Sequence, residues 1–502
     1  MMPPETTPRR RVTLPLAVAA LLTVAVLWLI ATGRALTALA RGPVSVGLWL
    51  GLALPLLGLA GWLLVRLARQ GRDVSPIGPL LGVATLTFGL YVSSCLAHPW
   101  GFAYPAALTL NPASNSYYQT AAESGGLWLM LRDYEKKMPA MVSHAQTAGA
   151  GPVLFYGVLR GCFRGRGLTE AVGETLLGLS PGVPLAQWTA TFRRAWQYPI
   201  TEEDVTAALL VALAVLALAA AGVVPAGLLG WELGGPRGAA AAAALWLLTP
   251  GLTIYTCCVD QVYASIAAVI LLAWLRAARA APEARGQGLA WAALASLMLT
   301  LGVIGSFGLL ALGAPLLVLG LLHAPRPGGL RVLAPRLAVL VLGPLIGYAV
   351  LKVAAGYDLL AVTRVEDYLR MQVHIASWGR PYRVYLWLNL SEPALMSGPP
   401  LLVALIAAGL PPGGAAALRR GQAWPVGTAI AAALVLTLLA MDVSGRTRGE
   451  TSRIYLFLTP VACAVAAAAA ERPGARRWAV SLAVLGALWL VGLRAVLNVW
   501  AF

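Results

Sequence analysis

The chain has 502 residues, of which 59% are hydrophobic and only 11% carry a charged side chain. Soluble globular domains carry about 25% charged residues, so this composition excludes an ordinary soluble fold and indicates a polytopic membrane protein. The formal net charge of +17 does not indicate a nucleic-acid partner, because the arginines are scattered singly between apolar runs, where basic residues set membrane topology.

Apolar runs recur along the chain at the length that a membrane-spanning helix requires, roughly 20 residues. The first run, Val12 to Ala31, has no small-residue cleavage site and exceeds the length of a signal-peptide core, so we expect a retained helix. The pattern predicts an all-α, polytopic integral membrane protein of about 12–15 transmembrane helices, folded as a single transmembrane domain over residues 1–502. The expected helices are 12–32, 45–67, 77–97, 205–229, 239–256, 261–278, 287–303, 306–322, 335–354, 398–411, 424–441, 453–470 and 477–497.

The positive-inside rule orients these helices. Arg9, Arg10 and Arg11 predict a cytoplasmic N-terminus, and the other basic stretches fall on the same side if each helix crosses once: 66–73, 276–285, 323–336, 418–422 and 471–477. The external side then receives residues 98–150, the turn at Asp260, residues 356–397 and residues 442–452. This arrangement predicts a multi-pass protein of a prokaryotic-type plasma membrane, with residues 151–204 forming a helical hairpin or re-entrant segment that begins and ends outside.

The first large external loop, residues 98–150, is too long for a plain connection and is rich in aromatic and apolar residues. Apolar side chains recur at helical spacing between Tyr117 and Leu131, which predicts an amphipathic helix at the membrane interface. A lone carboxylate in such a loop is either a solvated surface group or a catalytic base. The polar candidates are Asn111, Asn115, Glu123, Asp133, Glu135, Lys136, Lys137 and His144.

The second external loop, residues 356–397, mixes charged and aromatic side chains. Arginine suits bidentate binding of phosphate, and aromatic rings suit stacking on a sugar or lining a lipid entrance. An interfacial aromatic belt with mutually paired charges is the alternative interpretation. The charged and polar candidates are Arg364, Glu366, Asp367, Arg370, His374, Arg380, Arg383 and Glu392, among Tyr368, Trp378, Tyr382, Tyr385 and Trp387.

Two further features lie on the external side. Asp260 stands at a helix start, where either capping or a substrate contact accounts for a negative charge. The connection "MDVSGRTRGETSR" contains Arg446, Arg448, Glu450 and Arg453, on the side where topology does not require arginine. Polar groups that membrane orientation does not require are candidates for a functional site, although a solvated loop whose charges pair with each other stays open.

The order of these motifs resembles the GT-C superfamily of membrane glycosyltransferases, which use polyprenyl-phosphate sugars. "NPASNSYYQTA" is similar to the start of their first external loop, with Asn111 or Asn115 where an acidic residue usually stands. "SHAQTAGAGPVLFYGVLR" resembles their H-x-x-x-H-P-P-G-P-V-L segment, with His144 at the first histidine and without the Pro-Pro pair. "DQVYASIAAVILLAWLRA" resembles a helix that begins with an aspartate, which matches Asp260.

The resemblance continues toward the C-terminus. "RVYLWLNLSEPALMSGPPLL" is similar to an NL-x-E-F segment, with Asn389 and Glu392 matching. "SGRTRGETSRIYLFLTP" is similar to a G-E-x-x-R-x-W-x-F signature, in which Glu450 and Arg453 match and Tyr455 replaces tryptophan. Together the matches cover most of residues 98–460 in the order of the superfamily.

The resemblance implies inverting transfer of a sugar from a polyprenyl-phosphate donor to a hydroxyl of a glycan, lipid or protein, at the outer face of the membrane, in cell-envelope glycan biosynthesis. Such transfer needs cations for the departing phosphate and a carboxylate that deprotonates the acceptor. The expected cations are Arg446, Arg448, Arg453, Arg380 and Arg383, and Glu450 is expected to orient one of them. The candidates for the base are Glu123, Asp133 and Glu135, with Asp260 as a substrate-orienting carboxylate. The remaining expected substrate contacts are Asn115, Tyr117, Tyr118, His144, Asn389 and Glu392.

No metal-ligand spacing is visible, so no structural metal is expected, while a divalent cation, Mg²⁺ or Mn²⁺, bound through the donor phosphate stays open. Two other classes of function also stay open. A transporter or flippase of a lipid-linked anionic glycan would tend to show paired repeats, and the sequence has no clear internal repeat. A catalytically silent membrane scaffold stays open because the expected acid of the first loop is replaced by asparagine.

Overall fold

The computed structural model describes residues 39–40, 45–180, 182–324, 329–376, 379–398, 401, 426–448, 451–470, 475–496 and 498–499. Apart from one pair of two-residue strands, β1 (Leu39–Ala40) and β2 (Asn498–Val499), the regular structure of these ranges is helical. The predicted all-α fold class is confirmed. The predicted helix 12–32, most of the predicted helix 398–411, the basic N-terminus and Glu450 lie outside the described residues.

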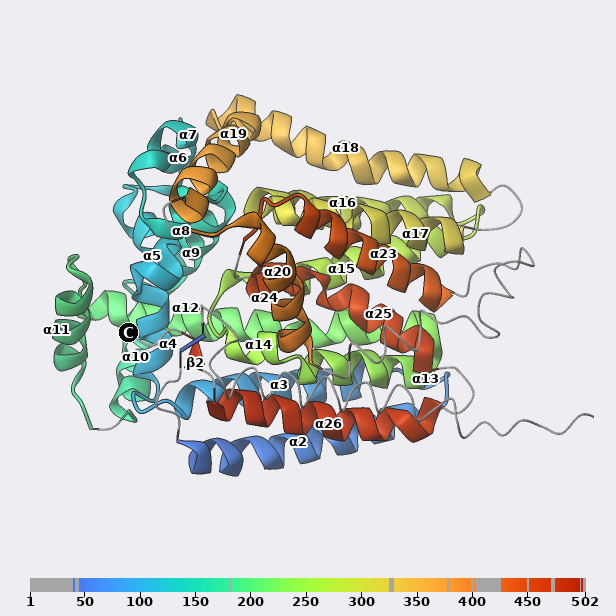
Figure 1. The fold of residues 1–502 in the computed structure, drawn as a ribbon, viewed down its shortest axis with the longest axis horizontal. Coiled ribbons are helices and arrows are strands. Elements are labelled where there is room, and N and C mark those ends of the chain that lie inside the picture. Colours follow the sequence, from blue (N-terminus) through green and yellow to red (C-terminus); the bar gives the residue numbers. More distant parts are fainter. Residues whose placement is uncertain are drawn as a thin grey trace, which may run out of the picture.

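Seven helices in the described ranges are long and apolar enough to cross a membrane, and the chain is a multi-pass membrane protein. They are α2 (Val46–Arg69), α3 (Ile77–Leu96), the stretch Glu202–Leu248 formed by α12 (Glu202–Ala221) and α13 (Val223–Leu248), α15 (Val259–Arg279), α16 (Arg285–Gly305), α18 (Gly329–Ala355) and α23 (Val426–Val443). The shorter apolar helices α17 (Gly313–His323), α25 (Thr459–Ala470) and α26 (Ala475–Val496) lie in the same bundle (Figure 1). The outer helix α18 leaves Leu345, Ile346 and Val353 exposed, as expected for a lipid-facing surface.

The stretch Glu202–Leu248 contains a reversal of the chain. Gly234 and Gly235 leave the helical conformation, and Gly235 has a φ of 52°. A Cβ atom on Gly230 would lie 2.4 Å from the carbonyl oxygen of Gly238, so the two segments pack at a distance that only glycine allows. The indole of Trp246 donates to the Ala219 carbonyl at 3.2 Å across the same interface. The reversal therefore corresponds to the two separate runs, 205–229 and 239–256, that the sequence predicts.

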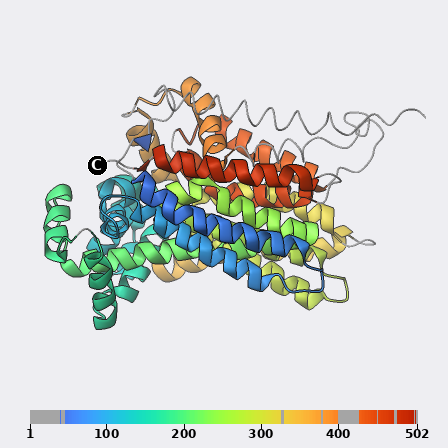
Figure 2. The ribbon, with the colours of Figure 1, turned by 90° about the horizontal axis from the view of Figure 1, so that it is seen from below.

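One end of the bundle, which we call the site end, carries the short helices and lies at the left of Figure 1. There the Ser45 amide before α2 donates to the Ala97 carbonyl after α3 at 2.8 Å. Figure 2 shows α10 and α11 standing at the same end after a turn of 90°. The helices of the site end are α4 (Ala103–Leu110), α5 (Pro112–Glu123), α6 (Leu127–Leu131), α7 (Tyr134–Lys137), η1 (Met138–Ala140), α8 (Ser143–Gln146), α9 (Ala150–Phe163), α10 (Gly167–Gly178), α11 (Leu185–Trp196), α19 (Leu359–Leu369) and the π-helical turn η3 (Arg370–Ala376). The other short helices are α14 (Pro250–Ile254), η2 (Phe307–Leu312), α20 (Tyr382–Ser397), α24 (Thr451–Ile454) and η4 (Tyr455–Leu458), of which α14, α20 and α24 lie further inward along the bundle (Figure 1).

The opposite end, which we call the basic end, holds the connections after α2 and α15 (Figure 1). Arg276 and Arg279 pair with Glu232 at 3.2 and 3.4 Å. The buried guanidinium of Arg336 donates to the Ala277 carbonyl at 2.8 Å, at the C-terminus of α15, where the helix dipole favours a cation. The basic stretches 66–73 and 276–285 thus lie at one end of the bundle, and the loop residues 98–150 and 356–376 at the other.

The described residues of 151–204 stay at the site end as the short helices α9, α10 and α11 before α12 begins. Arg160 of α9 pairs with Asp204 at 2.9 Å, and Arg164 pairs with Glu203 at 2.9 Å. Thr201 and Asp204 form a capping box at the start of α12. These contacts fix the short helices against the N-terminus of a spanning helix.

Candidate functional site

A pocket of about 180 Å³ lies at the site end, where six separate segments of the chain meet. The described residues that line it are Tyr117, His144, Thr147, Ala148, Gly149, Pro152, Val259, Asp260, Tyr263, Val303, Ile304, Gly305, Ser306, Phe307, Gly308, Glu366, Arg370, Ile375, Arg380, Met441, Arg446, Thr447, Arg448, Arg453 and Ile454. Five of these are arginines and two are carboxylates, so the described lining carries an excess of positive charge. Such a lining favours an anionic ligand.

The loop between α8 and α9 and the first turn of α9 reach the pocket because Gly149 and Gly151 allow close approach. A Cβ atom on Gly151 would lie 2.4 Å from the Cα atom of Gly305, at the C-terminal end of α16. A Cβ atom on Gly149 would lie 2.9 Å from the Ile304 carbonyl oxygen. The loop therefore lies directly on the break between α16 and η2, and both segments line the pocket.

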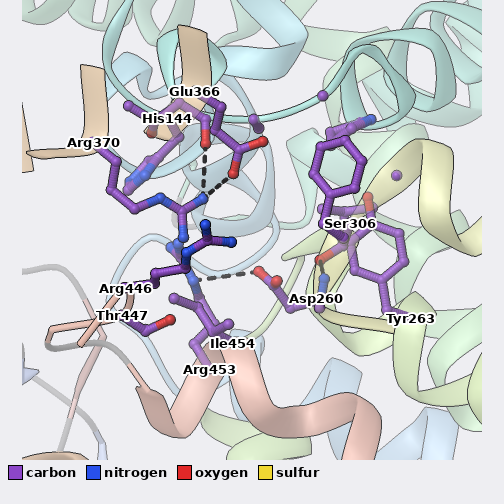
Figure 3. Close-up of a pocket in the computed structure, with 18 of the residues that line it drawn as sticks. His144, Asp260, Tyr263, Ser306, Glu366, Arg370, Arg446, Thr447, Arg453 and Ile454 are labelled. Atoms are coloured by element: carbon purple, nitrogen blue, oxygen red, sulfur yellow. Dashed lines mark hydrogen bonds and ion pairs between the residues drawn. The ribbon is translucent and has the colours of Figure 1, made fainter. Parts of the chain in front are cut away.

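Asp260 and Arg453 form a largely buried ion pair in the pocket. The Nε atom of Arg453 lies 3.3 Å from Oδ2 of Asp260, and the two side chains are 8% and 20% exposed. Asp260 stands in the first turn of α15, where the helix dipole favours a negative charge. Figure 3 shows the two side chains pointing toward each other across the pocket floor. The structure thus brings together two residues that the sequence matched separately.

The segment that follows α23 supplies two more arginines. Arg446 pairs with Asp367 at 3.1 Å, and both side chains are well exposed, at 68% and 40%. The Nη1 atom of Arg448 donates to the Arg380 carbonyl at 3.0 Å, and Nη1 of Arg380 donates to the Arg448 carbonyl in return. This reciprocal contact joins residues 443–448 to the start of α20.

Tyr382 and Gly445 fix the geometry of this contact. The Arg448 guanidinium lies over the Tyr382 ring at 5.4 Å, and the Tyr382 hydroxyl donates to the Val443 carbonyl at 2.9 Å. Gly445 has a φ of 62°, and a Cβ atom there would lie 2.9 Å from the Tyr382 ring. Only glycine combines this backbone conformation with the close ring, so the turn aims Arg446 and Arg448 at the pocket.

Glu366 and Arg370 form a second charged pair, on the side of the pocket away from Arg453 (Figure 3). Arg370 also donates to the Thr147 carbonyl at 3.3 Å, which ties η3 to the loop after α8. Burial raises the pKa of the Glu366 carboxyl above its usual range, although the neighbouring Arg370 acts in the opposite direction. The sequence places both residues in the charged second external loop, where the motif matches assign neither of them a role.

Tyr117 and His144 complete the wall next to Glu366. Their ring centroids lie 6.5 Å apart, and the Tyr117 ring stacks on Tyr156 at 6.3 Å. Burial raises the pKa of the Tyr117 phenol above its ordinary value, so the phenol stays protonated and able to donate a hydrogen bond. Tyr118 points elsewhere, because its hydroxyl donates to the Asp204 carbonyl at 3.3 Å, outside the pocket lining.

Asn389 and Glu392 are buried behind the pocket and do not line it. The Asn389 amide donates to Oδ1 of Asp442 at 3.1 Å and to the Thr447 carbonyl at 2.7 Å. The Thr451 hydroxyl lies 3.2 Å from Oε2 of Glu392 and donates to it. These contacts hold both ends of the segment that carries Arg446 and Arg448. Arg383 is exposed and absent from the lining.

The three predicted base candidates of the first loop do not line the pocket. Glu123 is exposed and accepts from the Gln119 side chain at 2.8 Å. Asp133 pairs with Lys136 at 2.7 Å on the surface, and Glu135 lies beside it on α7. Asn111 caps α5 by accepting from the Ala113 amide at 2.9 Å.

Asn115 lies at a kink of α5, with a φ of −148°, and is buried outside the pocket lining. An amide at this position cannot accept a proton as a carboxylate does. The carboxylates among the described lining residues are instead Asp260 and Glu366, which come from different parts of the chain.

A second cavity, apolar and of about 100 Å³, is lined by residues of α23, α20, η4 and α25. Met441 and Ile454 line the polar pocket, whereas Leu438 and Tyr455, the next inward residues on α23 and η4, line the apolar cavity. Its other lining residues are Leu390, Pro393, Ala394, Ser397, Leu401, Leu434, Leu456, Leu458, Thr459 and Ala462. The cationic pocket and the apolar cavity are therefore lined by neighbouring residues of the same two segments.

A metal site would need a cluster of suitable ligands. Within the part of the chain that the structure describes, no group of three or more His, Cys, Asp and Glu side chains could hold a metal ion.

Fold and pocket together define a multi-pass membrane protein with an arginine-lined polar pocket at one end of its helix bundle. No protein family and no curated protein matches the sequence. Among solved structures, the chain is similar in part to the crystal structure of the Archaeoglobus fulgidus oligosaccharyltransferase in complex with zinc and sulfate. The sequence identity is 15% and the TM-score 0.32, over 63% of this chain and 44% of the oligosaccharyltransferase chain. The chain thus spans less than half the length of that enzyme, and the likeness assigns it no activity.

Proposed function

We propose that the protein is a membrane glycosyltransferase that moves a sugar from a polyprenyl-phosphate donor to a hydroxyl acceptor, with inversion at the anomeric carbon. The observation that carries the proposal is the pocket itself, in which arginines from two parts of the chain, residues 370–380 and residues 446–453, surround two largely buried carboxylates. The adjoining apolar cavity suits the first units of a lipid chain. A phosphate linked to a lipid combines the negative charge and the apolar tail that the two cavities would bind.

In this proposal the donor phosphate lies against Arg446 and Arg448. The present partner of Arg446 is Asp367, in an ion pair exposed enough to be worth only about 0–1 kcal/mol. A phosphate can therefore displace Asp367 at little cost. Arg448 is held by carbonyl contacts and by the Tyr382 ring, which set its direction. Both cations would stabilise the charge that develops on the departing phosphate.

Arg453 and Asp260 would act as one unit on the pocket floor. A guanidinium fixed by a carboxylate is pre-organised, so it loses little conformational freedom when it binds a ligand oxygen. Asp260 would orient a sugar hydroxyl while Arg453 faces the phosphate. The chemical step forms a bond from the acceptor oxygen to the anomeric carbon and breaks the bond from that carbon to the phosphate oxygen, which leaves with the electron pair. The acceptor proton passes to a carboxylate of the pocket.

The proposal is tested with the purified full-length protein in lipid nanodiscs. The donors are polyprenyl phosphates carrying mannose, glucose or arabinose, and the acceptors are octyl glycosides. Products are identified by mass spectrometry. We expect transfer with at least one donor, loss of transfer in Arg453→Ala, and weakened donor binding in Arg446→Ala.

Absence of both donor binding and transfer across the panel would overturn the proposal. Unchanged donor affinity and turnover in both variants would overturn the assignment of the arginines. Movement of an intact donor between the leaflets of a vesicle, without cleavage, would favour a flippase instead. The matched control is Arg194→Ala, which removes an exposed arginine of α11 outside the pocket.

A further inference from the structure

We propose that Glu366 is the carboxylate that receives the acceptor proton in the proposed reaction. The inference rests on the proposed function and assigns the base, which that function leaves open between the pocket carboxylates. Glu366 lies on α19, in a loop separate from the first external loop where the sequence predicts the base. Three features of the described residues support this role: burial, an oxygen without a partner, and the surrounding charges.

The side chain of Glu366 is in an unusual state for a carboxylate. The residue is only 7% exposed, and it lines the pocket. Arg370 donates to its Oε1 atom, whereas the buried Oε2 atom has no hydrogen-bond partner among the described residues. Buried polar atoms are nearly always hydrogen-bonded, so such an orphan calls for a ligand that supplies the donor. A hydroxyl group of an acceptor placed in the pocket is a donor of the required kind.

The second carboxylate of the pocket is less suited to the role. Asp260 faces the Arg453 guanidinium at 3.3 Å and lies in the first turn of α15, so its negative charge is stabilised from two sides. A carboxylate held this way gains little by taking up a proton. The negative charge of Glu366 gains no such stabilisation from a helix dipole, because the residue stands near the C-terminal end of α19.

The charges that face Glu366 come from several elements. Arg370 of η3 and Arg446 of the segment after α23 favour its ionised form, whereas the adjacent Asp367 opposes it. Burial outweighs the two arginines and raises the pKa of the carboxyl group above its usual value. The phenols that face it, Tyr117 of α5, Tyr134 of α7 and Tyr357 before α19, stay protonated because burial also raises their pKa values. A base with a raised pKa accepts a proton more readily near neutral pH.

The proposed proton transfer conserves atoms and charge. The O–H bond of the acceptor breaks, its proton moves to Oε2 of Glu366, and the oxygen uses its electron pair to form the new glycosidic bond. Arg370 stays on Oε1 and keeps the carboxylate oriented. The phosphate leaves with the electron pair of the former glycosyl–phosphate bond, so Glu366 loses the negative charge that the leaving group gains.

The test compares Glu366→Gln with wild type in the nanodisc transfer assay, using polyprenyl-phosphate mannose, glucose and arabinose as donors and octyl glycosides as acceptors. Gln is isosteric and keeps an oxygen for Arg370, but it cannot take the proton. We expect kcat to fall by about 10²- to 10⁴-fold, with donor KM changed by less than about threefold. Glu366→Asp keeps a carboxylate with a shorter reach and is expected to retain intermediate activity. Glu174→Gln, an exposed glutamate of α10, is the matched control.

The pH profile separates chemistry from a structural role. The base must be ionised, so kcat/KM of the wild type is expected to fall as the pH drops through the raised pKa of Glu366, and this acid limb is expected to disappear in the residual activity of Glu366→Gln. Wild-type kcat in Glu366→Gln, or an unchanged acid limb, would overturn the assignment while leaving the glycosyltransferase proposal intact. A loss of donor binding in Glu366→Gln would also overturn it, because a base contacts the acceptor. Absence of transfer by the wild type would overturn both proposals.

Discussion

The ion pair between Asp260 and Arg453 gives a prediction whose magnitude follows from its geometry. At 3.3 Å, with side chains only 20% and 8% exposed, the Coulomb attraction is at most about 5 kcal/mol for an effective dielectric constant of about 20. The cost of removing both charges from water offsets most of this attraction. We therefore expect a coupling free energy of about 1–3 kcal/mol between the two side chains.

The assay is a double-mutant cycle of Arg453→Ala, Asp260→Asn and the double variant, with the free energy of unfolding measured in detergent by denaturant titration. The double variant is expected to lose less stability than the sum of the losses in the two single variants. Each single variant pays an extra cost, because it leaves the partner side chain without its opposite charge. Arg453→Lys is a further control, since lysine keeps the charge but lacks the planar guanidinium. Additivity within about 0.5 kcal/mol would refute the claim that the two residues form one unit.

Three other predictions follow from single contacts. Arg446→Ala is expected to weaken donor binding by about 10- to 100-fold, the loss of one hydrogen bond to a charged group, with a nearly unchanged melting temperature; a binding titration that matches wild type contradicts it. Gly151→Val would place a Cβ atom only 2.4 Å from the Cα atom of Gly305, so we expect a marked loss of thermal stability. Gly161→Val, at an open position of the same helix, is the control that we expect to be tolerated. Asp358→Ala removes the cap of α19 and is expected to cost about 1 kcal/mol, whereas Asp358→Asn keeps the cap but loses the charge that pairs with Lys352, so its stability is expected to lie between those of Asp358→Ala and wild type; equal unfolding free energies for Ala and wild type contradict the capping role.

The cap of α19 also predicts a pH dependence. Lys352 lies 2.9 Å from Asp358, and this partner together with the helix amides lowers the pKa of the Asp358 carboxyl to about 2. Because the folded-state pKa lies below the unfolded-state value, the carboxylate adds stability above about pH 4, and this contribution is lost as the pH falls toward 2. Unfolding measured from pH 6 to 2 is expected to show a smaller acid loss in Asp358→Asn than in wild type.

The fold class could be predicted from the sequence because a membrane helix must be continuous and apolar over its whole length. The distribution of basic residues also predicts which connections share an end of the bundle. Arg276 lies at the basic end and Asp260 at the site end, the two ends of α15. The helix boundaries within the first external loop could not be predicted from the spacing of apolar residues. Sequence spacing predicts one amphipathic helix from Tyr117 to Leu131, but Gly125 and Gly126 have φ values of 66° and 141° and separate α5 from α6.

The candidate site could be predicted only in part. Asp260, Arg446, Arg448 and Arg453 line one pocket, and each stands in or beside a short connection between apolar runs, where a charged residue that membrane orientation does not require is a candidate for a functional site. Glu366 could not be singled out, because its burial and its unpartnered oxygen arise from the packing of α19 against distant loops. One signal was available: Glu366 and Arg370 have the i,i+4 spacing of an intrahelical ion pair.

The central claim is that the arginine-lined pocket binds the phosphate of a lipid-linked sugar. The most direct measurement is the release of polyprenyl phosphate from the donor panel by purified wild type and by the Arg446→Ala, Arg448→Ala double variant, with Arg194→Ala as the control. We predict release by wild type and control with at least one donor, and a loss of at least about 100-fold in the double variant. Equal release by wild type and the double variant would contradict the claim.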